Sequence, residues 1–264
     1  MAFLRTLTFI LLLIQGYWVC ASDAVSPLPF DLINASQERS KDHVLEFWGY
    51  HDYEGSQNYS DTLKLRYYNP VNIGDWHGTA RLDTSYISNY GPQQANQSTG
   101  TYTPNTAMLT VWGGLPTWFG NAGARVIAPL QNQGQWAAGP QLSTSFRPKS
   151  TDTNLFSDFS PLTRYLYGFS PRNAPGSAPP ALLRHLELYP TLGFNLDRNT
   201  QIRFWDENSI NYNTAGGGWF VPIDAMVTHR VSPHFLFAVG AAKQVVQTYQ
   251  QYNWSVYSKL SFTF

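Results

Sequence analysis

The amino-acid sequence predicts an all-β protein, a single transmembrane antiparallel up-and-down β-barrel of about 12 strands. Charged residues make up only 13% of the chain and aromatic residues 16%, whereas an average protein has about 25% charged residues. Segments of roughly ten residues alternate apolar and polar side chains, which indicates strands with two different faces. After residue 21, no apolar run approaches the length of a membrane-spanning helix, so a closed barrel is the remaining route into a membrane.

The first 21 residues have the layout of a secretory signal peptide that is cleaved on export. Arg5 supplies the positive charge, the apolar run 7–14 follows, and the segment ends in the small residues Cys20 and Ala21. A run of about eight apolar residues is too short for an anchor, because a spanning helix needs roughly 20. Since Cys20 is the only cysteine, we expect neither a disulfide nor a cysteine metal site in the rest of the chain.

Residues 22–43 contain prolines and charges but no alternation, so we interpret them as a periplasmic or plug-like N-terminal segment. Residues 44–264 hold the alternating segments and would form the barrel. In chain order, the predicted strands lie at residues 44–51, 61–68, 76–86, 106–113, 124–130, 136–147, 162–169, 182–197, 201–205, 219–230, 235–241 and 253–264.

The strands 61–68, 182–197 and 219–230 show the period best. In D-T-L-K-L-R-Y-Y, leucine and tyrosine alternate with Lys64 and Arg66. In L-E-L-Y-P-T-L-G-F-N-L, every second residue from the first is apolar except the proline. In W-F-V-P-I-D-A-M-V, every second residue from the first is apolar, and Asp224 lies on the other face of the strand. A period of two is the pattern of a strand whose two faces meet different environments.

Short turns and long polar connections separate the strands. Gly74-Asp75 and residues 232–234 are short turns, whereas residues 88–105, 149–160 and 170–180 are long and polar. This mixture is typical of a membrane barrel with short turns at one end and longer loops at the other. We expect the loops 88–105 and 170–180 to act as gates.

A soluble β-sandwich or lipocalin-like barrel is the main alternative fold, because its strands alternate as well. In such a protein the apolar face forms the core and the polar face meets water. That surface would normally carry more charge than a content of 13% allows. The composition therefore favours the membrane barrel.

The polar face of each predicted strand would line the lumen. Basic residues dominate this set, since many acids, among them Asp158, Asp206 and Glu207, are expected in loops or at strand ends. A basic excess would give the lumen a mild preference for anionic solutes; the alternative is a ladder of mutually neutralising charges that fills a narrow barrel. The predicted pore-lining residues are Lys64, Arg66, Arg81, Asp83, Arg147, Arg164, His185, Glu187, Arg203, Asp224, Arg230 and Lys259.

Motifs for catalysis or nucleic-acid binding are missing from the sequence. None of the six histidines is followed two residues later by serine, and no G-x-S-x-G elbow occurs. The triplet 216–218 precedes a strand rather than a helix, so it indicates a turn and not a phosphate loop. With 17 basic and 17 acidic residues and no basic stripe, nucleic acid is not an expected partner. We expect no enzyme activity, no cofactor and no metal site.

The last twelve residues, N-W-S-V-Y-S-K-L-S-F-T-F, alternate up to the final residue. Trp254 and Phe262 belong to an apolar row that would face lipid, with aromatic rings at both ends where interfacial girdles lie. Lys259 would face the lumen. Phe264 and Phe262 are also expected to form the aromatic C-terminal signal that the outer-membrane barrel assembly machinery binds. The predicted location is the bacterial outer membrane.

Several segments, in order, resemble a group of outer-membrane proteins described as transporters or as MetA-pathway-of-phenol-degradation-like. The resemblance spans roughly residues 44–264 and implies a barrel through which small, often aromatic or hydrophobic, molecules pass. The segments are N-Y-S-D-T-L-K-L-R-Y-Y-N-P (58–70), G-D-W-H-G-T-A-R-L (74–82), Q-W-A-A-G-P-Q-L-S (135–143), L-E-L-Y-P-T-L-G-F-N-L (186–196) and G-W-F-V-P-I (218–223).

From these observations we expect a channel or facilitator for the passive passage of small molecules that are hydrophobic, aromatic or anionic. Its partners would be outer-membrane lipids, the barrel assembly machinery and the solute. Two alternatives remain at this point. One is a barrel enzyme that modifies lipid, such as a lipase or a lipid A deacylase, and the other is a closed structural or adhesive barrel.

Overall fold

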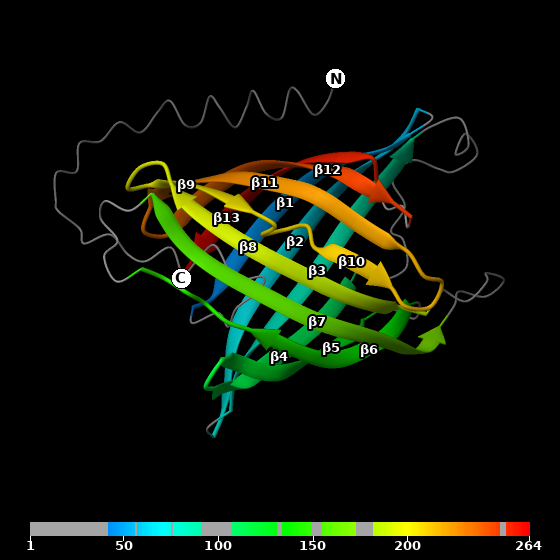
Figure 1. The fold of residues 1–264 in the computed structure, drawn as a ribbon, viewed down its shortest axis with the longest axis horizontal. Coiled ribbons are helices and arrows are strands. Elements are labelled where there is room, and N and C mark those ends of the chain that lie inside the picture. The colour runs from blue at the N-terminus through cyan, green and yellow to red at the C-terminus, as the bar shows by residue number, and fades with distance from the viewer. Residues whose placement is uncertain are drawn as a thin grey trace.

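The structure, a computed structural model, contains a single 13-stranded antiparallel sheet that closes into a barrel (Figure 1). It describes residues 42–55, 57–74, 76–90, 107–130, 134–148, 155–172, 182–248 and 252–264. Within these ranges, no helix is long and apolar enough to cross a membrane. The predicted signal peptide and most of the segment 22–43 lie outside the described residues, as do 91–106 and 173–181, which make up most of the two predicted gating loops.

The strands follow one another around the barrel in chain order. Each strand pairs with the next along the chain, apart from the β9–β10 break described below, and the last pairs with the first through Leu45↔Phe262 and Tyr53↔Trp254. In the described sheet every strand therefore has a neighbouring strand on each side, so closure removes the free edge strands that an open sheet would have. The strands are β1 (Val44–Gly55), β2 (Asn58–Ile73), β3 (Trp76–Tyr90), β4 (Ala107–Thr117), β5 (Gly120–Pro129), β6 (Gly134–Ser143), β7 (Phe156–Arg172), β8 (Arg184–Asn195), β9 (Thr200–Phe204), β10 (Ile210–Asn213), β11 (Trp219–Ser232), β12 (Phe235–Gln247) and β13 (Trp254–Thr263).

Strands β9 and β10 are two halves of one interrupted strand. Strand β8 pairs with both, through Phe194↔Ile202 and Leu188↔Ile210, and β11 also pairs with both. Thirteen strands therefore fill 12 positions, which confirms the predicted fold class and strand number. Strand β10 was not predicted from the sequence, because its four residues are too few for a periodic pattern.

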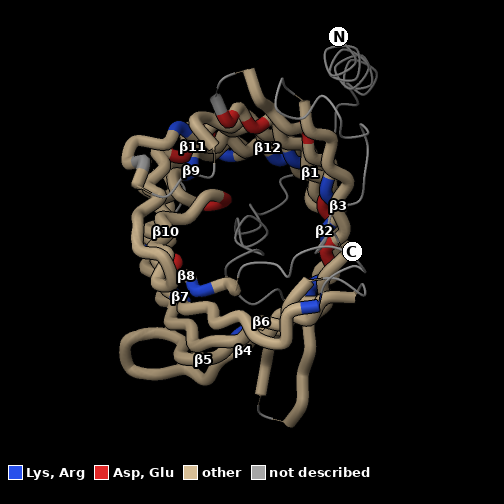
Figure 2. The backbone as a smooth tube through the Cα atoms, turned by 90° about the vertical axis from the view of Figure 1, so that its right-hand side faces the viewer, with Lys and Arg blue, Asp and Glu red and all other residues tan. Residues whose placement is uncertain are grey.

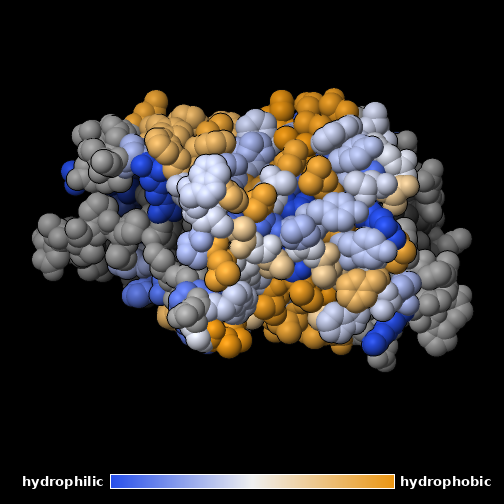
Figure 3. All heavy atoms as spheres, turned by 60° about the horizontal axis from the view of Figure 1, so that its bottom comes forward, coloured by the Kyte–Doolittle hydropathy of each residue, from blue (hydrophilic) through white to orange (hydrophobic). Residues whose placement is uncertain are grey.

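Burial follows the predicted two-residue period. Along β11, Trp219, Ile223 and Val227 are exposed, whereas Asp224 and Thr228 are completely buried. Figure 3 shows groups of hydrophobic side chains spread across the outer surface; large exposed ones include Leu63, Leu82, Leu109, Leu142 and Val239. The apolar face points out and the polar face points in, which is the reverse of the soluble alternative.

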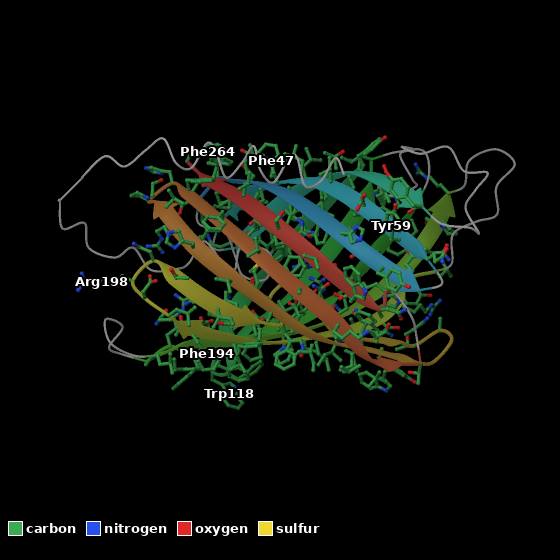
Figure 4. The ribbon with its side chains drawn as sticks, turned by 90° about the horizontal axis from the view of Figure 1, so that it is seen from above. Phe47, Tyr59, Trp118, Phe194, Arg198 and Phe264 are labelled. Carbon is green, nitrogen blue, oxygen red and sulfur yellow. The ribbon has the colours of Figure 1, made fainter. Side chains whose placement is uncertain are left out.

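Aromatic rings gather near both ends of the seam between β1, β2 and β13. At one end Phe47, Phe262 and Phe264 pack with neighbouring rings, and at the other Tyr59 stacks on Tyr90 and Trp254 on Tyr53. Figure 4 shows Phe47 and Phe264 lying far from Tyr59 along the barrel. Such girdles belong at the two interfaces of a bilayer.

Candidate pore interior

Most of the predicted pore-lining residues lie on the inner wall. Figure 2 looks along the barrel and shows that basic and acidic residues occur at many positions around the ring of strands. Arg66, Asp83, Glu187, Arg203, Asp224, Arg230 and Lys259 are buried, and Lys64, Arg81, Arg164 and His185 are partly buried on the same parity of their strands.

Arg147 does not join this set. Strand β6 ends at Ser143, and beyond it the pairing with β7 continues only through the Thr144 N–H, which donates to the Pro161 carbonyl, and the isolated bridge Phe146↔Phe159. Arg147 is exposed outside the strand. It precedes Pro148, which has no N–H to extend a ladder, so the alternation in the sequence runs further than the strand does.

The inward basic residues are held mainly by carboxylates on the same wall. Arg164 forms an ion pair with Glu187 on the neighbouring strand β8. Arg81 contacts Asp83 at 2.7 Å, and the Lys259 Nζ lies 3.4 Å from a Glu46 oxygen across the β1–β13 seam. A buried charge is tolerated when such a partner and its hydrogen bonds are present.

Arg203 is the centre of a buried triad. Its Nη1 lies 2.8 Å from Asp158 Oδ1 and its Nε 3.0 Å from Asp206 Oδ1. The exposed fraction of all three side chains is 4% or less. Asp158 and Asp206 were expected from the sequence in loops or at strand ends, so neither was predicted as a partner of Arg203.

Residues 205–209, between β9 and β10, turn into the barrel rather than away from it. Trp205 has a φ of 50°, its indole Nε1 donates to the Pro222 carbonyl at 2.8 Å, and Asn208 Nδ2 donates to Asp224 Oδ1 at 3.0 Å. These contacts fasten the segment to β11. In Figure 2 it is the projection with acidic residues at its tip beside β9 and β10.

Glu207, carried by this segment, reaches β1 and β2. Arg66 donates to its two oxygens at 3.0 and 2.8 Å, and the Tyr50 hydroxyl donates to Oε1 at 2.6 Å. Glu207, too, was expected outside the lumen. Because Asp158, Asp206 and Glu207 all lie inside, the interior holds much less basic excess than the sequence analysis expected.

Aromatic rings lie between the cations of β1 to β5 and β13. The Trp48 ring is 4.7 Å from the Arg66 guanidinium carbon and 4.9 Å from Lys259 Nζ. The Trp112 ring is 4.3 Å from the guanidinium carbon of Arg125 and 5.7 Å from that of Arg81. Desolvated contacts of this kind each contribute about 2 kcal/mol, so the rings help to hold the cations on the wall.

Arg125 on β5 is a lumen residue that the sequence analysis missed. It is 1% exposed, and its Nε donates to Gln141 Oε1 at 3.2 Å. Its Nη2 has no hydrogen-bond partner, and no described carboxylate contacts it. The signal was present in A-R-V-I-A, where one arginine interrupts an apolar run, but the weak periodicity of 124–130 left its face undecided.

Among the residues that the structure describes, no group of His, Cys, Asp and Glu side chains could hold a metal ion. The described interior offers ion pairs, hydroxyls and aromatic rings. Such a surface can contact polar or charged solutes and water.

The sequence matches no protein-family model and no curated protein. The fold, in contrast, is similar to solved barrels. A COG4313 outer membrane channel from Pseudomonas putida F1 aligns with a TM-score of 0.57 at 11% identity, over 86% of this chain and 98% of that one. The NanC porin aligns with a TM-score of 0.50 at 10% identity, over 83% and 99%. At these identities the likeness establishes the barrel fold, and the predicted MetA-pathway-like family stays a prediction.

Proposed function

We propose that the protein is a channel of the bacterial outer membrane through which small molecules pass passively. The observation that carries the proposal is the closed barrel of 12 strand positions, apolar outside and charged inside. Eight strands leave room only for side chains or one small ligand, whereas 16 to 18 leave an aqueous channel. A barrel between these sizes with a charged inner wall is suited to a narrow, hydrated pore. The similarity to a solved channel and a porin supports the proposal.

The charge distribution favours small anionic solutes over the hydrophobic or aromatic ones that the family resemblance implies. Most inward cations contact a carboxylate, so they contribute little net field. Among the described residues, no carboxylate contacts Arg125, which shares the Trp112 ring with Arg81. This part of the wall, on β3 to β5, therefore carries a local positive excess that attracts anions.

The proposal also covers how the protein reaches and enters the outer membrane. The N-terminal 21 residues would direct export and be removed, and the C-terminal strand would be bound by the barrel assembly machinery. The exposed aromatic side chains of β13 and its end, Phe262 and Phe264, are available for that contact before the barrel closes.

Conductance of the purified full-length barrel in planar bilayers tests the proposal, with swelling of liposomes in sugars and organic acids as a second measurement. We expect discrete conductance steps and swelling with small solutes. The control is the same protein unfolded by heat before addition. Correctly folded protein that gives neither steps nor swelling would overturn the channel.

A further inference from the structure

We propose that residues 205–209 are the internal constriction of the channel and that Glu207 sets its size limit. This inference rests on the proposed channel function and deepens it. It assigns the size limit to a contact inside the barrel, whereas the sequence analysis expected gating by the loops 88–105 and 170–180.

The segment is built to remain inside the barrel. A strand that ran straight from β9 to β10 would keep its side chains alternating between lipid and lumen. Instead the chain leaves the sheet at Trp205, in a backbone conformation that non-glycine residues rarely adopt. Asp224 of β11 anchors the segment, because it accepts a hydrogen bond from Asn208 Nδ2 at 3.0 Å. Asp224 is itself buried and also accepts a hydrogen bond from the Tyr257 hydroxyl at 2.5 Å, which fixes its position.

The far end of the segment is held as firmly as its base. Glu207 accepts two hydrogen bonds from the Arg66 guanidinium and one from Tyr50. Charge-assisted, bidentate bonds of this type are the strongest that side chains form. The Arg66 Nε lies 3.4 Å from Asp83, and its guanidinium lies over the Trp48 ring, so the partner of Glu207 is fixed in place.

This contact differs in direction from the other ion pairs described above. Arg81–Asp83 lies within one strand, Arg164–Glu187 and Lys259–Glu46 join neighbouring strands, and Arg203–Asp158 joins β9 to β7, the next strand but one. All of them run along the wall. The Glu207–Arg66 pair joins the β9–β10 break to β2, and β11, β12, β13 and β1 lie between them in the sheet.

A link between two parts of the wall that are not adjacent must occupy part of the space that they enclose. Residues 205–209 therefore reduce the cross-section open to a solute, and the Glu207 carboxylate holds them in that position. Without the Arg66 and Tyr50 contacts, the segment would remain attached only to its own side of the barrel, through Asp224 of β11, Arg203 of β9 and Thr191 of β8, and could move back toward that wall.

The test compares Glu207→Ala with the double variant R66Q/E207Q, which removes both charges and leaves no buried ion alone. Glu187→Gln is the matched control, because it also breaks an arginine–carboxylate pair in the lumen, but one that runs along the wall. Heat-modifiable mobility on gels selects the folded barrels. Single-channel conductance and the largest sugar that swells liposomes are then measured for each.

We expect E207A and R66Q/E207Q to raise conductance about twofold or more and to admit larger sugars, because a wider pore conducts more and excludes less. E187Q should keep the wild-type values. Wild-type values in both Glu207 variants would overturn the constriction while leaving the channel in place, and so would an equal increase in E187Q. If neither the wild type nor any folded variant conducts, the proposed function fails, and the constriction fails with it.

Discussion

The buried triad of Arg203, Asp158 and Asp206 predicts a large loss of stability when its cation is removed. In Arg203→Met, two carboxylates that are at most 4% exposed would lose their guanidinium while remaining inside the barrel. Breaking a buried pair by removing one partner costs about 3 to 5 kcal/mol, because the remaining charge is neither solvated nor compensated. We expect the free energy of unfolding to fall by about that amount.

The assay is guanidinium unfolding of the barrel in lipid vesicles, followed by tryptophan fluorescence. Arg198→Met is the matched control, because Arg198 is exposed in the turn before β9, at the end of the barrel in Figure 4; a surface change of this kind stays within about 0.5 kcal/mol. The triple variant D158N/R203M/D206N should recover much of the loss, since it leaves no uncompensated charge. An R203M barrel as stable as R198M, or a triple variant no better than R203M, would refute the reasoning.

Three further predictions follow from single residues. Arg125→Gln should shift the permeability ratio of chloride to potassium toward the cation, whereas Lys243→Gln, on the exposed face of β12, should leave it unchanged; equal ratios in all three proteins would contradict the local positive excess. Phe264→Ala should lower the amount of heat-modifiable barrel in the outer membrane, and Thr263→Ala, one residue earlier and on the opposite parity, should not. The backbone N–H groups of Asn199 and Thr200 lower the pKa of Asp197. The wild type should therefore be more stable than Asp197→Asn above the unfolded-chain pKa of this carboxyl. That advantage should disappear as the pH falls through the lowered folded-state pKa, and a difference between the two unfolding curves that does not change with pH would count against it.

The strand faces could be predicted because they depend on local pattern. Leu63 and Lys64, or Val256 and Lys259, lie on opposite sides of their strands whatever the partner strand is, since successive side chains of a strand point to opposite faces. The ends of the strands were less certain. Arg147 continues the alternating pattern of the sequence beyond the end of strand β6 at Ser143, because a strand also needs a partner strand in register.

The position of Glu207 could not be predicted from the sequence. D-E-N-S after a short strand has the composition of an exposed turn, and its partners are 141 and 157 residues away. Whether such a turn points to water or to the lumen depends on which acceptors and donors face it from other strands. Arg66, Tyr50 and Asp224 supply them only once the barrel has closed.

The sequence by itself determined the architecture: low charge, strands with an apolar face and a C-terminal row of alternating aromatics are sufficient for a closed barrel with its apolar side outward. Only the tertiary structure decided the chemistry of the interior. Closure brings Glu46 to Lys259 and Glu207 to Arg66, the pairing of β7, β8 and β9 brings Asp158 to Arg203, and Arg125 is left without a described carboxylate. The physical reason is the distance along the chain over which each property is set. The direction of a side chain depends on its own strand, whereas its charge partner depends on the register and closure of the whole sheet.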